Sequence, residues 1–409
     1  MYDQGYAQPA DILEAVRIDR KTYCILAVTT FFCSCVKPFS PAVTTVNQNI
    51  LVVEGFIDTG GDTTKIKLSH TVTIGNKISS VIESGATVTV ENATGTSYPV
   101  PETKVKGSYA SAGALAITSG KQYRIRIKTS GSKTYASDLV DAKATPPIDS
   151  IGHTYTSDGI QFYVNAHDAT NNTRYYKYAF SEAWEFHAKY GSGWISNGVN
   201  GATPRTTAQD IFFCYNTDSS TFVTLNSTAA LASDVVSQFP INSISQTSEK
   251  LEIRYTILIS QQALTKDGYN FWHNIKTNTE QLGSIFDAQP SAISGNIHNV
   301  NVASEPVIGF ISAGSIQKKR IYINKTDLPA SFLAQYPYLC DVIDGAVFPT
   351  EGGSPPAPIP WAWAVVIRQP SPNRITDADG PGGPYSFTTA ECADCTIRGT
   401  HNPPSFWKF

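Results

Sequence analysis

Two cysteines near the N-terminus have the spacing and the setting of a modification site. Cys33 and Cys35 follow the apolar segment 24–32, which is far shorter than the roughly 20 residues that cross a bilayer but has the length of a signal-peptide core. A positively weighted segment, 17–21, precedes this core, and the small residue Ser34 precedes Cys35. These features predict a bacterial lipoprotein signal that is cleaved before Cys35, whose thiol carries a lipid.

A disulfide or a metal pair is the alternative for Cys33 and Cys35. Cys-x-Cys is too short to close an unstrained bridge easily, and no other ligand residue lies nearby. Segment 1–35 is therefore expected to be a leader with a lipoprotein signal. Because this leader opens with acidic residues, which are unusual there, we expect Val16 to begin the natural precursor from an alternative initiator codon. Segment 36–48 is predicted to be a flexible tether.

Four further cysteines, Cys214, Cys340, Cys392 and Cys395, lie in the mature chain. An even number of cysteines in an exported chain predicts disulfides, and four cysteines allow three pairings. A zinc site of four thiolates is an alternative, but only Cys392 and Cys395 form a close pair. A thioredoxin-like redox pair would need a helix N-terminus after a strand. We expect disulfides that attach the C-terminal segment to the domain before it.

Other patterns that could support catalysis or metal binding are weak. Glu182 and Glu185 flank Trp184 as a pair of glycosidase carboxylates flanks a sugar-stacking platform, but residues three apart in a strand point to opposite faces. Segment 377–380 begins like a calcium loop, yet proline follows it and the twelfth position is Thr388. The seven histidines show no metal-ligand spacing. We therefore expect a protein that is not an enzyme and has no cofactor or metal.

Composition and periodicity indicate a mainly β protein. A net charge of −3 gives no basic field to hold a phosphate backbone, which argues against nucleic acid as a partner. Apolar and polar residues alternate, between turn clusters, in segments 50–57, 64–74, 86–92 and 123–129. This pattern predicts an immunoglobulin-like or transthyretin-like β-sandwich over residues 49–147, which ends at Pro146 and Pro147.

A larger β-rich domain is predicted over residues 148–335. It contains one inserted α-helix at about 265–282, with Thr265 as its N-cap and Gly283 as its stop. Residues 336–409 are rich in proline and glycine and are predicted to form a C-terminal wrap held by disulfides.

Aromatic residues are dense in two regions. The candidates for binding a protein partner or a sugar are Tyr176, Tyr178, Trp184, Trp361 and Trp363. Core packing is the other interpretation, because alternating aromatic residues suit a half-buried sheet. The pattern itself leaves both interpretations open.

Several phrases of the sequence together resemble one family. They are NILVVEGFI at 49–57, PPIDS at 146–150, RYY at 174–176, WEFH at 184–187, QLGSIFDAQP at 281–290 with GNI at 295–297, CADCTIRG at 392–399 and PSFW at 404–407. Over about 45–409 the chain resembles a large family of Bacteroidota lipoproteins, the domain of unknown function 4249. The resemblance implies an outer-membrane lipoprotein, often encoded beside a SusC-type TonB-dependent transporter, with no established catalytic residues.

These indications together predict a non-catalytic accessory binding subunit of a TonB-dependent uptake system, anchored in the outer membrane through the lipid on Cys35. A structural subunit of an outer-membrane assembly or secretion complex is the alternative. The cell surface is favoured over the periplasmic face. However, segment 36–39 lacks the acidic residues that surface-exported lipoproteins of this phylum often carry after the lipidated cysteine.

Overall fold

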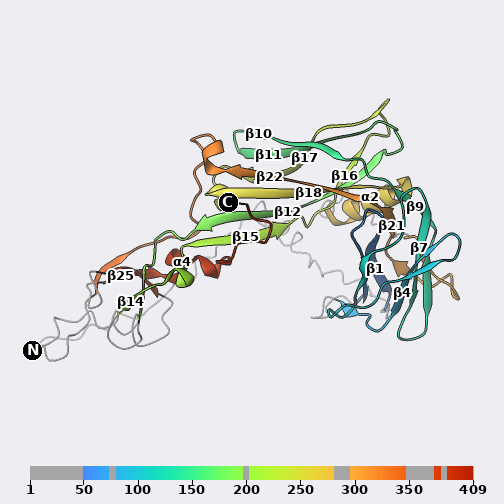
Figure 1. Ribbon diagram of the computed structural model, residues 1–409, viewed down its shortest axis with the longest axis horizontal. Coiled ribbons are helices and arrows are strands. Elements are labelled where there is room, and N and C mark those ends of the chain that lie inside the picture. The colour runs from blue at the N-terminus through green and yellow to red at the C-terminus, as the bar shows by residue number, and fades with distance from the viewer. Residues whose placement is uncertain are drawn as a thin grey trace, which may run out of the picture. The chain divides into compact units, whose positions relative to one another are not determined.

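The computed structural model describes residues 49–72, 80–196, 202–280, 295–346, 373–378 and 385–408. Several predictions fall outside these residues: the lipidation site Cys35, the tether 36–48, the helix stop Gly283 and the candidate binding residues Trp361 and Trp363. The described chain is mainly β, as predicted (Figure 1). None of its helices is long and apolar enough to cross a membrane.

The first module is a β-sandwich. Its strands are β1 (Leu51–Asp58), β2 (Thr63–His70), β3 (Val81–Ile82), β4 (Thr87–Asn92), β5 (Ser97–Pro99), β6 (Ser108–Ala114), β7 (Gln122–Lys128), β8 (Thr134–Ser137), β9 (Val140–Lys143), β19 (Ile297–Asn299), β20 (Val307–Ile308) and β21 (Ser312–Gly314). Alternate residues of each strand point inward, so Leu51 and Val53 of β1 share one apolar core with Ile125 and Ile127 of β7. The described strands pair in the order β19-β8-β7-β9-β21-β1-β2-β3.

The last three strands of the sandwich come from residues that the sequence assigned to the second domain. Strand β21 pairs in parallel with both β1 and β9, and β20 also pairs in parallel with β1. The predicted boundary at residue 147 is therefore incomplete, because the chain returns to the sandwich over residues 297–314. Gly309 permits this close approach: a Cβ there would lie 2.2 Å from the Val53 carbonyl oxygen, and its φ is +144°.

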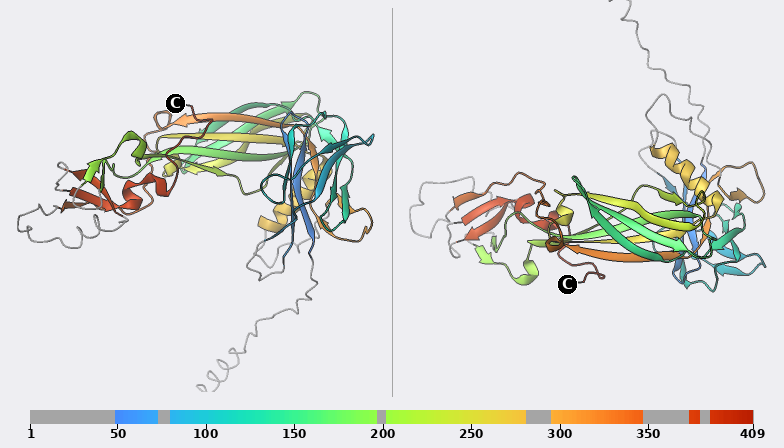
Figure 2. Two further views of the ribbon diagram at one scale, coloured as in Figure 1. Left: turned by 60° about the horizontal axis from the view of Figure 1, so that its bottom comes forward. Right: turned by 90° about the horizontal axis from the view of Figure 1, so that it is seen from above.

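The second module packs two antiparallel sheets around another core. One sheet holds β10 (Ile148–Tyr155), β11 (Gly159–Asp168) and β17 (Asp234–Ser245). The other holds β15 (Phe213–Ser219), β12 (Tyr175–His187), β18 (Arg254–Ala263) and β22 (Ile316–Asn324), and β16 (Thr224–Ser227) also pairs with β12. In Figure 2 the orange strand β22 runs alongside β18 and β12. Phe162 of β11 and Ile257 of β18 are among the side chains buried between the sheets.

The predicted helix is present as α2 (Lys266–Glu280). The Thr265 hydroxyl accepts a hydrogen bond from the Gly268 backbone N–H at 3.1 Å, so Thr265 caps the helix as predicted. Trp272 of α2 packs over β12, where the Lys177 Nζ atom lies 3.3 Å from the centroid of its ring.

Two disulfides are present, as predicted, but only one joins the C-terminal segment 336–409 to the second module, because Cys340 and Cys392 both lie within that segment. Cys214 of β15 pairs with Cys395, and Cys340 pairs with Cys392. The remaining described elements are β13 (Trp194–Ser196), β14 (Ala202–Pro204), β23 (Ile343–Ala346), β24 (Asn373–Ala378), β25 (Tyr385–Thr389), α4 (Ala390–Ala393) and the short 3-10 turns η1 (Thr207–Gln209), η2 (Glu249–Leu251), η3 (Lys325–Asp327) and η4 (Cys395–Ile397).

The two disulfides differ in the length of chain that they close. They span 181 residues for Cys214–Cys395 and 52 residues for Cys340–Cys392. We expect removal of either to lower the free energy of unfolding by about 2–5 kcal/mol, with the longer loop costing about 1 kcal/mol more, because closing it restricts the unfolded chain more. Denaturant unfolding of the Cys214→Ala/Cys395→Ala and Cys340→Ala/Cys392→Ala variants tests this order. Equal losses would contradict the entropic account.

Candidate functional site

The aromatic residues of β12 do not form an exposed binding patch. Tyr176, Tyr178 and Trp184 are buried in the core of the second module, because the even-numbered positions of β12 face the opposite sheet. The prediction that these three side chains dock a partner is wrong, and the core-packing interpretation is confirmed. Tyr176 also donates a hydrogen bond to the buried carboxylate of Asp234.

The two carboxylates of β12 point to opposite faces, as expected. Glu182 is buried, pairs with Lys250, and accepts hydrogen bonds from the Tyr255 hydroxyl at 2.6 Å and the Asn242 amide at 3.2 Å. Glu185 faces away from this core, and burial raises the pKa of its carboxyl group. The pair therefore cannot converge on one glycosidic bond. Within the residues that the structure describes, no three His, Cys, Asp or Glu side chains could hold a metal ion together.

A groove of about 600 Å³ lies where the sandwich meets the second module. The end of β9, the linker 144–147 and the turn after β11 line it. Buried hydrogen bonds fix the linker: the Thr145 hydroxyl accepts from the Ala263 N–H at 2.9 Å, and the Gln261 amide donates to the Pro146 carbonyl at 2.8 Å. Groups of the second module thus hold in place the backbone that borders the groove.

Two basic residues, Lys143 and His167, line this groove. His167 contacts Asp149 at 2.7 Å between Nδ1 and Oδ2, and this hydrogen bond holds the pKa of His167 above its ordinary value. No ion pair or hydrogen bond engages the amine of Lys143 within the described chain. Asp168 accepts hydrogen bonds from its own turn and Asp141 accepts one from Gln122, so both carboxylates are fixed but keep their charge. The Lys143 amine is therefore the contact that the groove offers to the carboxylate or phosphate group of a small ligand.

A second groove, of about 400 Å³, lies between the turn after β8 and helix α2. Its polar lining is acidic or amide, and includes Asp138, Asp267, Asn270, Asn274 and Asn296. This lining offers no lysine or arginine to an anion. We therefore take the groove at the junction as the candidate functional site.

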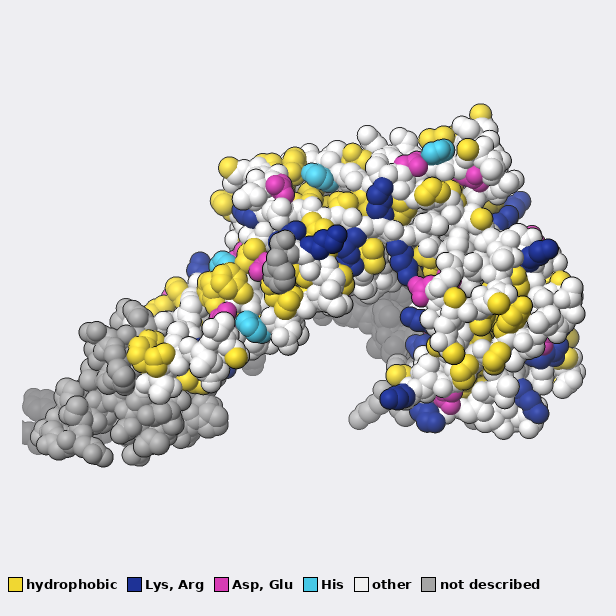
Figure 3. Space-filling view, viewed as in Figure 1, with side chains coloured by type: hydrophobic (Ala, Val, Ile, Leu, Met, Phe, Trp, Pro, Cys, Tyr) yellow, Lys and Arg dark blue, Asp and Glu magenta, His cyan; other side chains and the backbone are white. Residues whose placement is uncertain are grey.

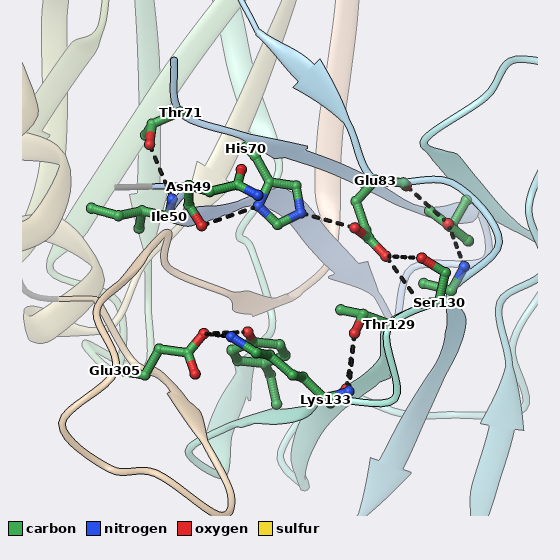
Figure 4. A network of polar contacts seen from close by, with 12 residues as sticks. Asn49, Ile50, His70, Thr71, Glu83, Thr129, Ser130, Lys133 and Glu305 are labelled. Carbon is green, nitrogen blue, oxygen red and sulfur yellow. Dashed lines mark hydrogen bonds and ion pairs between the residues drawn. The ribbon is translucent and has the colours of Figure 1, made fainter. Parts of the chain in front are cut away.

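A polar network joins the loops at the end of the sandwich where the described chain begins (Figure 4). The His70 Nε2 atom lies 2.8 Å from Glu83 Oε2, and the other oxygen of Glu83 accepts two hydrogen bonds from Ser130. Burial raises the pKa of Glu83, but the bonds from His70 and Ser130 outweigh this effect and hold the pKa below its ordinary value. We call this end of the sandwich the tether end.

The sequence model described as Domain of unknown function (DUF4249) matches residues 36–320. The chain belongs to the DUF4249 family. The matched region contains the whole sandwich, the junction groove and most of the second module, and ends within β22.

Comparisons beyond the DUF4249 family are distant. A crystal structure of a DUF4785 family protein from Legionella pneumophila has 14% identity and a TM-score of 0.20, and the match covers 52% of each chain, about half of that protein. A structure of manganese lipoxygenase of Gaeumannomyces graminis with part of zonadhesin of Komagataella pastoris has 11% identity and a TM-score of 0.16, over 54% of this chain and 90% of that one. No curated protein matches the DUF4249 chain.

The contact between His167 and Asp149 predicts a pH dependence. Because Asp149 raises the folded-state pKa of His167, its contribution to stability is full below about pH 6.5 and is lost as the pH rises through the raised value. The Asp149→Asn variant should return the pKa of His167 to the ordinary range. Proton NMR titration of the His167 ring tests this, with His298 as the internal control. An unchanged titration of His167 in the variant would contradict the assignment.

Proposed function

We propose that this DUF4249 protein is a non-catalytic, lipid-anchored binding protein of the outer membrane that serves a TonB-dependent uptake system as an accessory subunit. The junction groove carries the binding part of this proposal. The signal-like segment that ends at Cys35 and the family resemblance support the location.

The groove favours ligand binding over turnover. Lys143 and His167 supply positive charge, while Asp141 and Asp168 are engaged by neighbouring groups. A bound anion would meet the Lys143 amine on a junction whose backbone is held by Thr145 and Gln261, so little backbone ordering would accompany binding. Such a site retains a ligand and hands it on unchanged.

The lipid anchor sets the location of this binding site in the cell. An anchor on Cys35 followed by the tether 36–48 confines the protein to the membrane plane and raises its effective concentration near a transporter in the same membrane. Ligand captured in the groove is then released close to the transporter.

The groove is testable with citrate and inorganic phosphate as anionic probes. We expect citrate to perturb the NMR signal of His167, and the Lys143→Met variant to weaken citrate binding about tenfold, since a lost charge-assisted hydrogen bond costs about 1.5–3 kcal/mol. Binding should also weaken as the pH rises through the raised pKa of His167. Lys104→Met, which changes an exposed lysine outside the groove, is the matched control. Equal affinity in both variants would exclude the groove as an anion site.

The partner is testable by affinity purification of the tagged protein from native outer membranes in mild detergent, with mass spectrometry of the recovered proteins. We expect a TonB-dependent transporter in stoichiometric amount. Recovery of assembly or secretion factors alone would favour the structural alternative. The Cys35→Ala variant should leave the membrane fraction, and its retention there would contradict the lipid anchor.

A further inference from the structure

Exposed aliphatic side chains gather at the tether end of the sandwich. Large apolar residues are exposed at six positions of the described sandwich, and five of these lie on loops or strands at this end: Val81 (47% exposed), Ile82 (56%), Val105 (69%), Val300 (53%) and Val302 (49%). The sixth, Leu139, lies in the turn between β8 and β9 at the opposite end. Five exposed aliphatic side chains at one end of a small module exceed the scattered singles that a protein surface normally carries.

Strand register brings these residues to one end. His70, the last residue of β2, pairs with both Leu51 and Val81, so β3 lies two strands from the start of β1. The loop that carries Val105 packs against β3, since a Cβ on Gly107 would lie 2.4 Å from a methyl group of Ile82.

The loop that carries Val300 and Val302 reaches the same network. The Asn299 side chain accepts hydrogen bonds from the N–H groups of Asn301 and Val302, and Glu305 pairs with Lys133 at 2.9 Å. Lys133 and Ser130 lie in one loop, and Ser130 bonds Glu83 directly after β3 (Figure 4). A continuous set of contacts therefore joins both groups of aliphatic side chains.

The carboxylates at this end are turned inward. Glu83 accepts from His70 and Ser130, and Glu305 accepts from Tyr135 at 2.6 Å and Lys133. Glu102 accepts from the backbone N–H groups of two glycines, Gly85 and Gly107. Each of these carboxylates thus fixes a loop, and its charge is balanced by a cation or by hydrogen bonds. The outer surface of this end is then formed by apolar and basic groups.

Lysines flank the most exposed of the aliphatic residues. Lys104 and Lys106 stand on either side of Val105; the Lys106 side chain is 72% exposed, and Lys104 forms no ion pair with the described residues. In Figure 3 hydrophobic side chains lie next to lysine or arginine side chains along the lower edge of the sandwich. An apolar residue between flexible lysines suits an interface where the apolar group enters lipid and the amines meet phosphate.

We propose that the tether end is a membrane-docking face, which inserts Val105 and its aliphatic neighbours among the headgroups of the bilayer that holds the lipid anchor. This inference rests on the anchor of the proposed function. The predicted tether is the reason for proposing a membrane at this face. Residues 36–48 reach at most about 45 Å, and the described chain begins at Asn49 on this same end, so a lipid on Cys35 would keep the face near the bilayer. The lipid would hold the protein on the membrane, and the docking face would fix its orientation there.

The test uses the full lipidated chain in vesicles of phosphatidylethanolamine and phosphatidylglycerol, with and without brominated acyl chains. We expect the added indole of the Val105→Trp variant to be quenched by the brominated lipids, and that of the matched Leu139→Trp variant to remain unquenched. Unquenched Val105→Trp in a vesicle-bound protein would overturn the docking face and point to a protein partner for it. Absence of the wild-type protein from the vesicles would instead refute the anchor.

A second measurement separates docking from anchoring. The unlipidated Cys35→Ala protein, which leaves native membranes on washing, should still bind weakly to the same vesicles when lipid is in large excess, and Val105→Asp should reduce this partition about tenfold, since a valine side chain is then lost from the apolar contact. Leu139→Asp should have no effect. The double variant Lys104→Gln/Lys106→Gln tests how much the two lysines contribute to vesicle binding. If this double variant abolished binding while Val105→Asp left it unchanged, the contact would be purely electrostatic and the insertion would be refuted.

Discussion

The linker between the two modules is the constraint on which the rest of the structure depends. Thr145 and Pro146 of this linker are buried, where each polar group must find a partner. The Thr145 hydroxyl makes two such contacts, because it donates to the Ser315 carbonyl at 2.5 Å and accepts from the Ala263 N–H. Residues from two distant parts of the chain, β18 and Ser315, thus hold this turn of backbone. The groove beside it exists because that turn cannot move without leaving buried groups unbonded.

Several carboxylates of the described chain hold neighbouring loops and strands together through hydrogen bonds. Glu182 holds η2 and two strands of the second module, Asp168 holds the turn after β11, and Glu83 with Glu305 holds the loops of the tether end. Each accepts several hydrogen bonds, which fixes the geometry around it.

The secondary-structure elements could be predicted from the sequence better than the contacts between them. The alternation of apolar and polar residues predicted strands, and Thr265 as an N-cap predicted the start of the helix, because both signals are local. The orientation of β12 was not available from its pattern: alternating aromatics fit a buried or an exposed face equally, and only the second sheet decides that Tyr178 is buried. Lys143 and His167 were missed because they lie 24 positions apart and converge only through the linker. The pair Pro146 and Pro147 was the one local signal near that site.

The position of β21 has a consequence for the order in which the protein matures. This strand fills the gap between β1 and β9, yet its residues follow almost the whole second module along the chain. In a chain that crosses a membrane from its N-terminus, the edges of β1 and β9 therefore stay unpaired until residue 314 has emerged. A fragment that ends before β21 would be prone to aggregate, because its β1 and β9 edges would stay unpaired.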